Sequence, residues 1–304
     1  MSGPEAHSLS ASRPSAWPGL LLAVGGAVAF SGKAIIVKLA YRHGVDAITL
    51  IMYRMLFALP LFVLLAWWAG RGKAALTRRD WFTVLGLGFS GYYLASTLDF
   101  IGLQYISASL GRLIAYLNPT LVLLLGMLLF GRRIRAAQIG ALAISYSGVF
   151  VVFGHEATLQ GGHVALGALC VFGSAISYAL YLVYSGEEVK RLGALRLTGL
   201  ASTIACLLCI VQFALLRPLS ALDVAPQVLW LSLLNATVCT VAPVLMMMAI
   251  ERIGAVLTAQ VGMLGPLATI AMGVLILDEP FTAWVAAGTA LVLLGIWMLA
   301  QRMR

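Results

Sequence analysis

Charged residues are scarce in this chain. Only 10% of the 304 residues are charged, whereas 62% are hydrophobic and the mean hydropathy is +0.99. A soluble domain of this length cannot bury so much apolar surface, so the composition excludes a water-soluble globular protein. Lipid must surround most of the chain, and the expected fold class is an all-α membrane protein.

Residues that usually carry catalysis or bind metals are also few. The four cysteines all fall within apolar segments and lack metal-ligand spacing, and the four histidines lie outside those segments. The sequence shows no paired carboxylates, no nucleophile beside a base and no Walker A loop. We therefore expect no catalytic residue, no metal site and no cofactor, and any transport must be gradient-driven or facilitated.

Ten segments have the roughly 20 apolar residues that a helix needs to cross a bilayer. They span residues 17–40, 48–69, 81–103, 109–130, 136–153, 165–185, 197–216, 228–250, 255–277 and 281–300. The polar stretch 1–16, rich in Ser and Pro, is expected to be a disordered cytoplasmic tail.

The chain contains an internal duplication at a constant offset of 147 residues. Matching positions in the two copies are Ile106 and Ile253, Leu117 and Leu264, Pro119 and Pro266, and Gly126 and Gly273. The two units, 17–154 and 165–300, each hold five predicted spans. An odd number of spans inverts the second unit relative to the first, as in many secondary transporters. We expect ten transmembrane helices in two inverted five-helix repeats.

Positive charge is distributed unequally between the two sides of these spans. Fourteen Lys and Arg residues fall on the side of both termini, and two, Arg42 and Arg217, fall on the opposite side. Since cytoplasmic loops are enriched in Lys and Arg, we predict that both termini are cytoplasmic. The net charge of +9 then reflects topology, and a nucleic-acid partner is not expected.

Charges stranded within apolar spans are candidates for a functional site, because they are costly to bury. They are Lys33, Lys38, Arg54, Asp99 and Arg112. Lys38 is expected to snorkel to the interface. Asp99 and Arg112 lie at equal distances from one turn, so they form either a structural ion pair or a switch in which Asp99 couples transport to protons. The surplus of cations predicts an anionic ligand.

Polar side chains also recur at helical spacing on several spans, which predicts that they line a shared cavity. We expect substrate contacts from Lys33, Arg54, Arg112, Tyr92, Ser96, Tyr116, Tyr181, Asn235 and Gln260. Pro119 and Pro266 lie well inside their spans, where each is expected to bend the helix. The matching positions favour hinges over static kinks.

The second half of each unit resembles an EamA-type repeat of the drug/metabolite transporter superfamily. The residues that carry the resemblance are Ser107, Leu117, Asn118, Pro119, Gly131, Ile139, Gly140 and Gly148, and in the second copy Ala255, Pro266, Leu277, Asp278, Glu279, Pro280, Gly288 and Gly295. One departure is Arg132, which stands where the family usually has an acidic residue. Glu279 fills that slot in the second copy only. The resemblance implies export of a small metabolite across a bacterial inner membrane.

The leading hypothesis is therefore a secondary transporter in the bacterial inner (plasma) membrane. It exports a small anionic or zwitterionic metabolite, such as an amino acid, an amino-acid derivative or an opine-type carboxylate metallophore, by alternating access. The alternatives are an uptake carrier, a non-transporting membrane scaffold and an intramembrane enzyme. Its partners are a small-molecule substrate and membrane lipid, and the sequence does not determine an oligomeric state.

Overall fold

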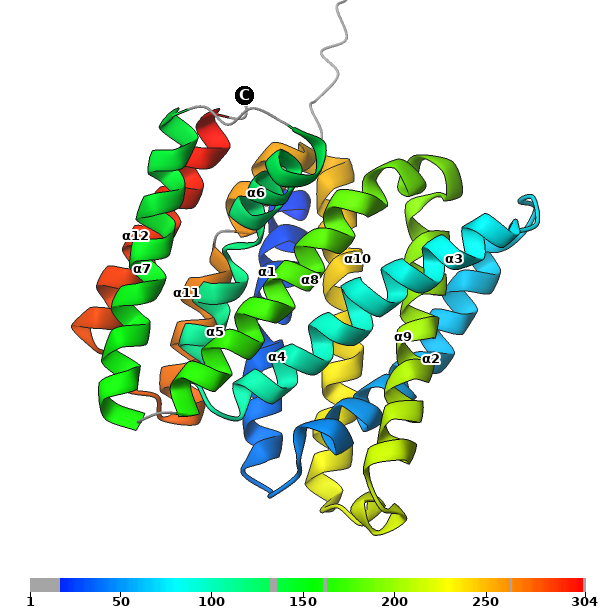
Figure 1. Cartoon of the computed structure of the whole chain (residues 1–304), viewed down its shortest axis with the longest axis horizontal. Coiled ribbons are helices and arrows are strands. Elements are labelled where there is room, and N and C mark those ends of the chain that lie inside the picture. Colours follow the sequence, from blue (N-terminus) through cyan, green and yellow to red (C-terminus); the bar gives the residue numbers. More distant parts are fainter. Residues whose placement is uncertain (1–16, 132–135, 161–162, 263, 303–304) are drawn as a thin grey trace, which may run out of the picture.

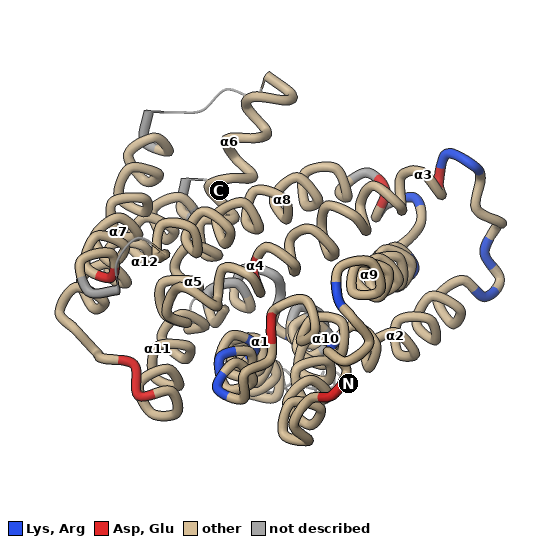
Figure 2. Tube along the Cα trace, turned by 60° about the horizontal axis from the view of Figure 1, so that its bottom comes forward, with Lys and Arg blue, Asp and Glu red and all other residues tan. Residues whose placement is uncertain are grey.

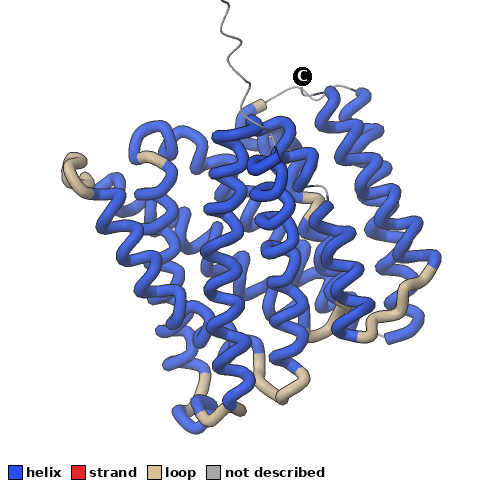
Figure 3. Tube along the Cα trace, turned by 180° about the vertical axis from the view of Figure 1, so that it is seen from behind, coloured by secondary structure: helices blue, strands red, loops and turns tan. Residues whose placement is uncertain are grey.

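The structure is a computed structural model that describes residues 17–131, 136–160, 163–262 and 264–302, and the predicted tail 1–16 lies outside these ranges. Helices pack side by side, and no strand occurs within these ranges (Figures 1 and 3). The helices are α1 (Trp17–Tyr41), α2 (Ala47–Gly70), α3 (Arg78–Leu87), η1 (Gly88–Leu94), α4 (Ala95–Leu103), α5 (Ala108–Ala115), α6 (Asn118–Phe130), α7 (Ala136–Gln160), α8 (His163–Leu192), α9 (Ala194–Leu216), η2 (Leu219–Leu222), α10 (Pro226–Gly262), α11 (Leu264–Leu277) and α12 (Ala283–Arg302).

Both ends of the described chain lie at the same end of the molecule, where α1 begins and α12 ends (Figure 1). We call this end the termini face and the opposite end the far face. Within the described residues, seven helical stretches are long and apolar enough to cross a bilayer, and two shorter apolar helices, Leu264–Leu277 and Ala283–Leu299, accompany them. With α10, they give the predicted all-α membrane fold of about ten crossings.

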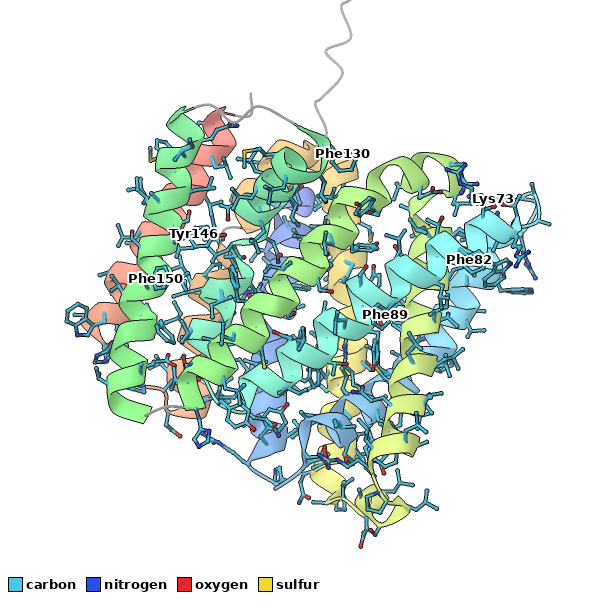
Figure 4. All side chains as sticks on the ribbon, viewed as in Figure 1. Lys73, Phe82, Phe89, Phe130, Tyr146 and Phe150 are labelled. Carbon is cyan, nitrogen blue, oxygen red and sulfur yellow. The ribbon has the colours of Figure 1, made fainter. Side chains whose placement is uncertain are left out.

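Large apolar side chains cover the outside of the bundle. Phe82, Phe89 and Phe150 project from α3, η1 and α7, and 62%, 46% and 67% of their respective surfaces are exposed (Figure 4). Charged residues are sparse along the helices (Figure 2). Such a surface is stable only against lipid.

The long helix α10 contains the turn that the sequence predicts at residues 252–254. A Cβ placed on Gly262 would lie 3.7 Å from Met246 Cε, although 16 residues of straight helix would separate these positions by about 24 Å. The chain must therefore reverse between them. Gly19, in the first turn of α1, packs against Ile253, which places the reversal at the termini face.

One crossing that we predicted as a continuous helix is interrupted instead. A turn at Tyr116 and Leu117 separates α5 from α6, just before Pro119. The matching position in the second copy is residue 263, which lies outside the described residues. The first copy therefore contains a broken helix just before its proline.

The helix α7 also differs from the prediction, which ended the fifth span at residue 153. The structure continues this helix to Gln160, so His155 and Glu156 belong to a helix and not to a loop. Their placement becomes important for the far face described below.

Contacts between helices repeat with the two units exchanged. α1 packs extensively on α10 and on α11, while α8, its counterpart, packs on α4 and α6. α2 packs on its counterpart α9, and α7 on its counterpart α12, where a Cβ on Gly288 would lie 2.6 Å from the backbone oxygen of Gly148. This exchange is the pattern expected for inverted repeats.

Candidate substrate site

The broken fourth crossing meets α10 and α11 in the interior. α5 contacts α11, and the Tyr116 hydroxyl donates a hydrogen bond of 2.7 Å to the backbone oxygen of Gly262. Any side chain at Gly265 would collide with the Tyr116 hydroxyl, so this close approach requires glycine. The N-terminus of α6 begins here, and helix N-termini carry partial positive charge.

Arg112 lies at this junction. Its guanidinium carbon is 4.7 Å from the ring centre of Phe30 and 5.0 Å from that of Tyr116. Its Nε atom is buried and has no hydrogen-bond partner among the residues that the structure describes, and none of the salt bridges found there involves Arg112. Aromatic faces stabilise the cation only in part. The junction therefore holds a positive charge that no described acid neutralises by direct contact.

Asp99 pairs with Lys33 and not with Arg112. The Lys33 Nζ atom lies 2.6 Å from Asp99 Oδ2, and the two side chains are only 20% and 15% exposed. The predicted Asp99–Arg112 pair is thus wrong for this structure. We predicted the pair because the two residues lie at equal distances from one turn and hence at similar depth. Equal depth does not fix direction: Asp99 on α4 faces α1, whereas Arg112 lies against Phe30 and Tyr116.

Arg54 joins the Lys33–Asp99 pair around one aromatic ring. The Phe100 ring centre is 5.6 Å from the Arg54 guanidinium carbon and 5.7 Å from Lys33 Nζ. Arg54 Nη1 donates to Ser96 Oγ at 3.4 Å, while Arg54 Nε is buried without a partner in the described part of the chain. Two cations and one acid therefore surround Phe100, which leaves this group positive.

The predicted tyrosines form a third group. The hydroxyl oxygens of Tyr92 and Tyr181 are 3.2 Å apart, and Tyr178 stacks on Tyr181 with ring centres 5.7 Å apart. Gly91 allows this packing, because a Cβ there would meet the Tyr181 ring. The tyrosines therefore hydrogen-bond and stack with one another at the η1–α8 contact.

Two further predicted residues are placed differently. Asn235 is buried and donates to the backbone oxygen of Lys33 at 3.0 Å, so it ties α10 to α1. The side chain of Gln260 lies outside the described part of the structure. The predicted residues thus fall into three groups, around Arg112, Phe100 and Tyr181, where we predicted one shared cavity.

Pro119 does not kink a continuous helix, which we had predicted. It is the second residue of α6 and follows the turn at Tyr116 and Leu117. Pro266 lies in α11, close to residue 263, which is outside the described residues, so the bend predicted there stays a prediction. Proline fits a first helical turn because amides there have no intrahelical partner. Their role as hinges stays a prediction.

A pocket of about 450 Å³ at the far face was not predicted. It is lined by polar residues that include Lys38, Arg42, Ser109, Glu156 and Glu279. Glu156 is a buried carboxylate that we did not predict, because only 6% of its surface is exposed. The extension of α7 beyond residue 153 is what buries it. Hydropathy is a poor signal for such an extension.

Lys38 does not simply snorkel towards water. Its Nζ atom donates to the backbone oxygens of Ile106 at 2.8 Å and Leu103 at 3.3 Å. It therefore holds the turn between α4 and α5.

Comparison with known proteins identifies the family. The profile of the EamA-like transporter family matches residues 17–154 and 165–301. The uncharacterized transporter YcbK of Bacillus subtilis (strain 168) is 30% identical over 276 residues, which cover 86% of each chain. The uncharacterized transporter YetK of the same organism is 23% identical over 285 residues, which cover 92% of this chain and 86% of that one.

A solved structure titled only "Crystal structure of protein" has the same fold. It superposes with a TM-score of 0.63 at 20% identity and covers 94% of this chain and 98% of its own. Family profile, relatives and helical membrane fold agree. The chain is a multi-pass membrane transporter that belongs to the EamA-like transporter family.

Proposed function

We propose that this transporter exports a small anionic or zwitterionic metabolite by alternating access. The observation that carries the proposal is Arg112, a guanidinium beside the break between α5 and α6 that contacts no acid among the described residues. The cargo class includes an amino acid, an amino-acid derivative or an opine-type carboxylate metallophore. The excess of Lys and Arg on the side of the termini supports cytoplasmic termini in a bacterial inner membrane.

An uncompensated charge in an apolar interior costs several kcal/mol. Its presence is understandable if a ligand supplies the opposite charge for part of the transport cycle. A carboxylate suits Arg112, because guanidinium groups bind carboxylates through two parallel hydrogen bonds. The N-terminus of α6 adds further positive potential at the same place.

Asp99 supplies the proton-coupled step in this proposal. Protonation of Asp99 would neutralise the partner of Lys33, so Lys33 would become available to an anionic substrate. Ionisation of Asp99 would restore the pair and weaken substrate binding. Pro119, next to the break between α5 and α6, and Pro266, at the matching position of the second unit, mark the hinges about which the helices move.

Counterflow in proteoliposomes tests the proposal. The purified carrier is assayed with radiolabelled glutamate, alanine, succinate and choline, in the wild type and in Arg112→Met. We expect exchange of at least one carboxylate compound but not of choline, and loss of that exchange in Arg112→Met. Arg71→Met is the matched control, because Arg71 is exposed and lies over Trp67.

Normal carboxylate exchange in Arg112→Met, or exchange of choline alone, would disprove the anionic assignment. Direction is measured separately by loading the labelled compound inside oriented vesicles. Net movement only towards the termini face would indicate uptake in place of export.

A further inference from the structure

We propose that Glu156 and Glu279 form a carboxylate latch that holds the N-terminus of α5 at the far face and thereby positions Arg112. The latch has no counterpart in the other repeat, so the resting carrier opens preferentially at the termini face. This inference rests on the proposed function, because it concerns the placement of the residue that binds the substrate there.

Glu279 accepts three hydrogen bonds from the first turn of α5. Its Oε1 atom accepts from the backbone nitrogen of Ala108 at 2.7 Å, and its Oε2 atom accepts from the nitrogen and hydroxyl of Ser109 at 3.3 and 2.8 Å. A carboxylate at a helix N-terminus also interacts favourably with the helix dipole. Glu279 follows α11, so these bonds join the end of α11 to the start of α5.

Glu156 acts on the same turn from α7. It accepts hydrogen bonds from the Ser107 hydroxyl and from the Ser107 backbone nitrogen, the latter at 3.2 Å. Ser107 is the N-cap of α5, and its hydroxyl oxygen accepts in turn from the backbone nitrogen of Leu110 at 2.9 Å. Hydrogen bonds to a charged group are stronger than those between neutral groups, so the two acids hold this helix end firmly.

The remaining charged groups of the pocket complete the far-face closure. Lys38, from α1, binds the α4–α5 turn through backbone oxygens. Arg42 donates to the backbone oxygen of Leu277 at 2.5 Å and lies 3.7 Å from Asp278. Asp278 has a φ of 59°, a left-handed conformation that turns the chain after α11. Together with His155 and the two glutamates, these groups gather the ends of α1, α7 and α11 on the start of α5.

Arg112 lies on α5, close to the end of the helix that the latch holds. Arg112 follows Ser107 by five residues, which is about 7.5 Å of helix. α5 ends at Ala115, where the helix is interrupted, so it can move without dragging α6. Release of the N-terminus of α5 would therefore shift Arg112 and open a path to the far face.

The duplication does not repeat the residues of the latch. At the constant offset of 147, the positions that correspond to Ser107, Ser109, Glu156 and Glu279 are occupied by Gly254, Val256, Met303 and Arg132. None of these side chains can accept hydrogen bonds as a carboxylate does. Opening at the far face therefore requires acids to be displaced, and the sequence places no matching acids at these positions of the other unit.

Hydrogen–deuterium exchange of the full-length carrier in nanodiscs, without substrate, tests the latch. We expect the amides of residues 108–115 to exchange about tenfold faster in Glu279→Gln and about threefold faster in Glu156→Gln, since hydrogen-bonding energy limits local opening. Asp223→Asn is the matched control, because Asp223 is an exposed acid outside the latch pocket. It should leave α5 unchanged.

Access from the far side tests the gate itself. In a background without the four native cysteines, Phe30→Cys beside Arg112 is exposed to a membrane-impermeant maleimide in oriented vesicles. We expect faster labelling from the termini face than from the far face. Glu279→Gln should accelerate far-face labelling several-fold.

Two results would overturn the latch: unchanged α5 exchange in Glu279→Gln, or equal acceleration in every helix, which indicates general destabilisation. Equal labelling from both faces in the otherwise native protein would overturn the one-sided gate. If Glu279→Gln does not insert, Ser109→Ala removes one of the three bonds and should still accelerate α5 about threefold. These readouts need no substrate, so they can fail independently of the anion assignment.

Discussion

Two arginines in this transporter occupy opposite electrostatic situations. Arg191, at the termini face, contacts both Asp80 and Glu188, and the contact with Glu188 measures 2.5 Å. Hydrogen bonds to these acids raise the pKa of Arg191, so it remains charged at physiological pH. Arg112, in the interior, contacts aromatic rings and has a buried Nε without a described partner.

The difference separates structural charges from transport charges. Asp80 also completes a capping box with Thr77 at the start of α3, so the Arg191 network fixes that helix to the end of α8. Among the described residues, no acid contacts Arg112 as Asp80 and Glu188 contact Arg191. A paired cation holds helices together, whereas an unpaired cation is available to a ligand.

The largest effect is expected for flux. Arg112→Met should reduce carboxylate flux at least a hundredfold, because the substrate carboxylate loses the guanidinium that binds it. Arg191→Met should leave flux per folded molecule within about twofold, because Arg191 does not bind substrate. Proteoliposome exchange normalised to folded protein measures both. Equal losses in the two variants would remove the distinction between these arginines.

The ion pair between Lys33 and Asp99 extends the comparison with Arg112, because its two charges are buried but neutralise each other. Lys33→Met should destabilise the protein by about 3–5 kcal/mol, since it leaves Asp99 buried without a partner. The double variant Lys33→Met/Asp99→Leu should recover most of that loss. Thermal unfolding in detergent provides the measurement, and an undiminished midpoint for Lys33→Met would contradict the pair.

The stability changes at the two arginines should have opposite signs. Arg112→Met should stabilise the fold by about 1–3 kcal/mol, because it removes an unneutralised interior charge. Arg191→Met should instead destabilise it, because the carboxylate of Asp80 loses its partner. Unfolding midpoints of both variants in the same detergent decide this, and a shared sign would refute the interpretation.

A smaller effect should follow from salt. Arg191 is half-exposed, so 1 M NaCl should weaken its network by less than about 1 kcal/mol. The Lys33–Asp99 pair is largely shielded and should be insensitive. Comparison of the unfolding midpoints of Asp80→Asn and of the parent at low and high salt tests this. An equally large salt effect in Asp80→Asn would show that the effect does not come from the Arg191 network.

Local properties of the chain were sufficient to predict much of this protein. Hydropathy and length predicted the membrane class and about ten crossings, because the cost of placing a residue in lipid depends mainly on that residue. The duplication around Pro119 and Pro266 predicted a helix irregularity at Pro119, although it predicted a bend where the structure has an interruption.

The partners of the interior charges depended on packing between distant helices. Lys33 finds Asp99 because α1 contacts α4, and Glu279 reaches Ala108 because the end of α11 lies on the start of α5. Periodicity along one helix reports which side chains share a face, but it contains no information about which helix that face meets. Those pairings, and with them the isolation of Arg112, arise only when segments separated by dozens of residues pack together.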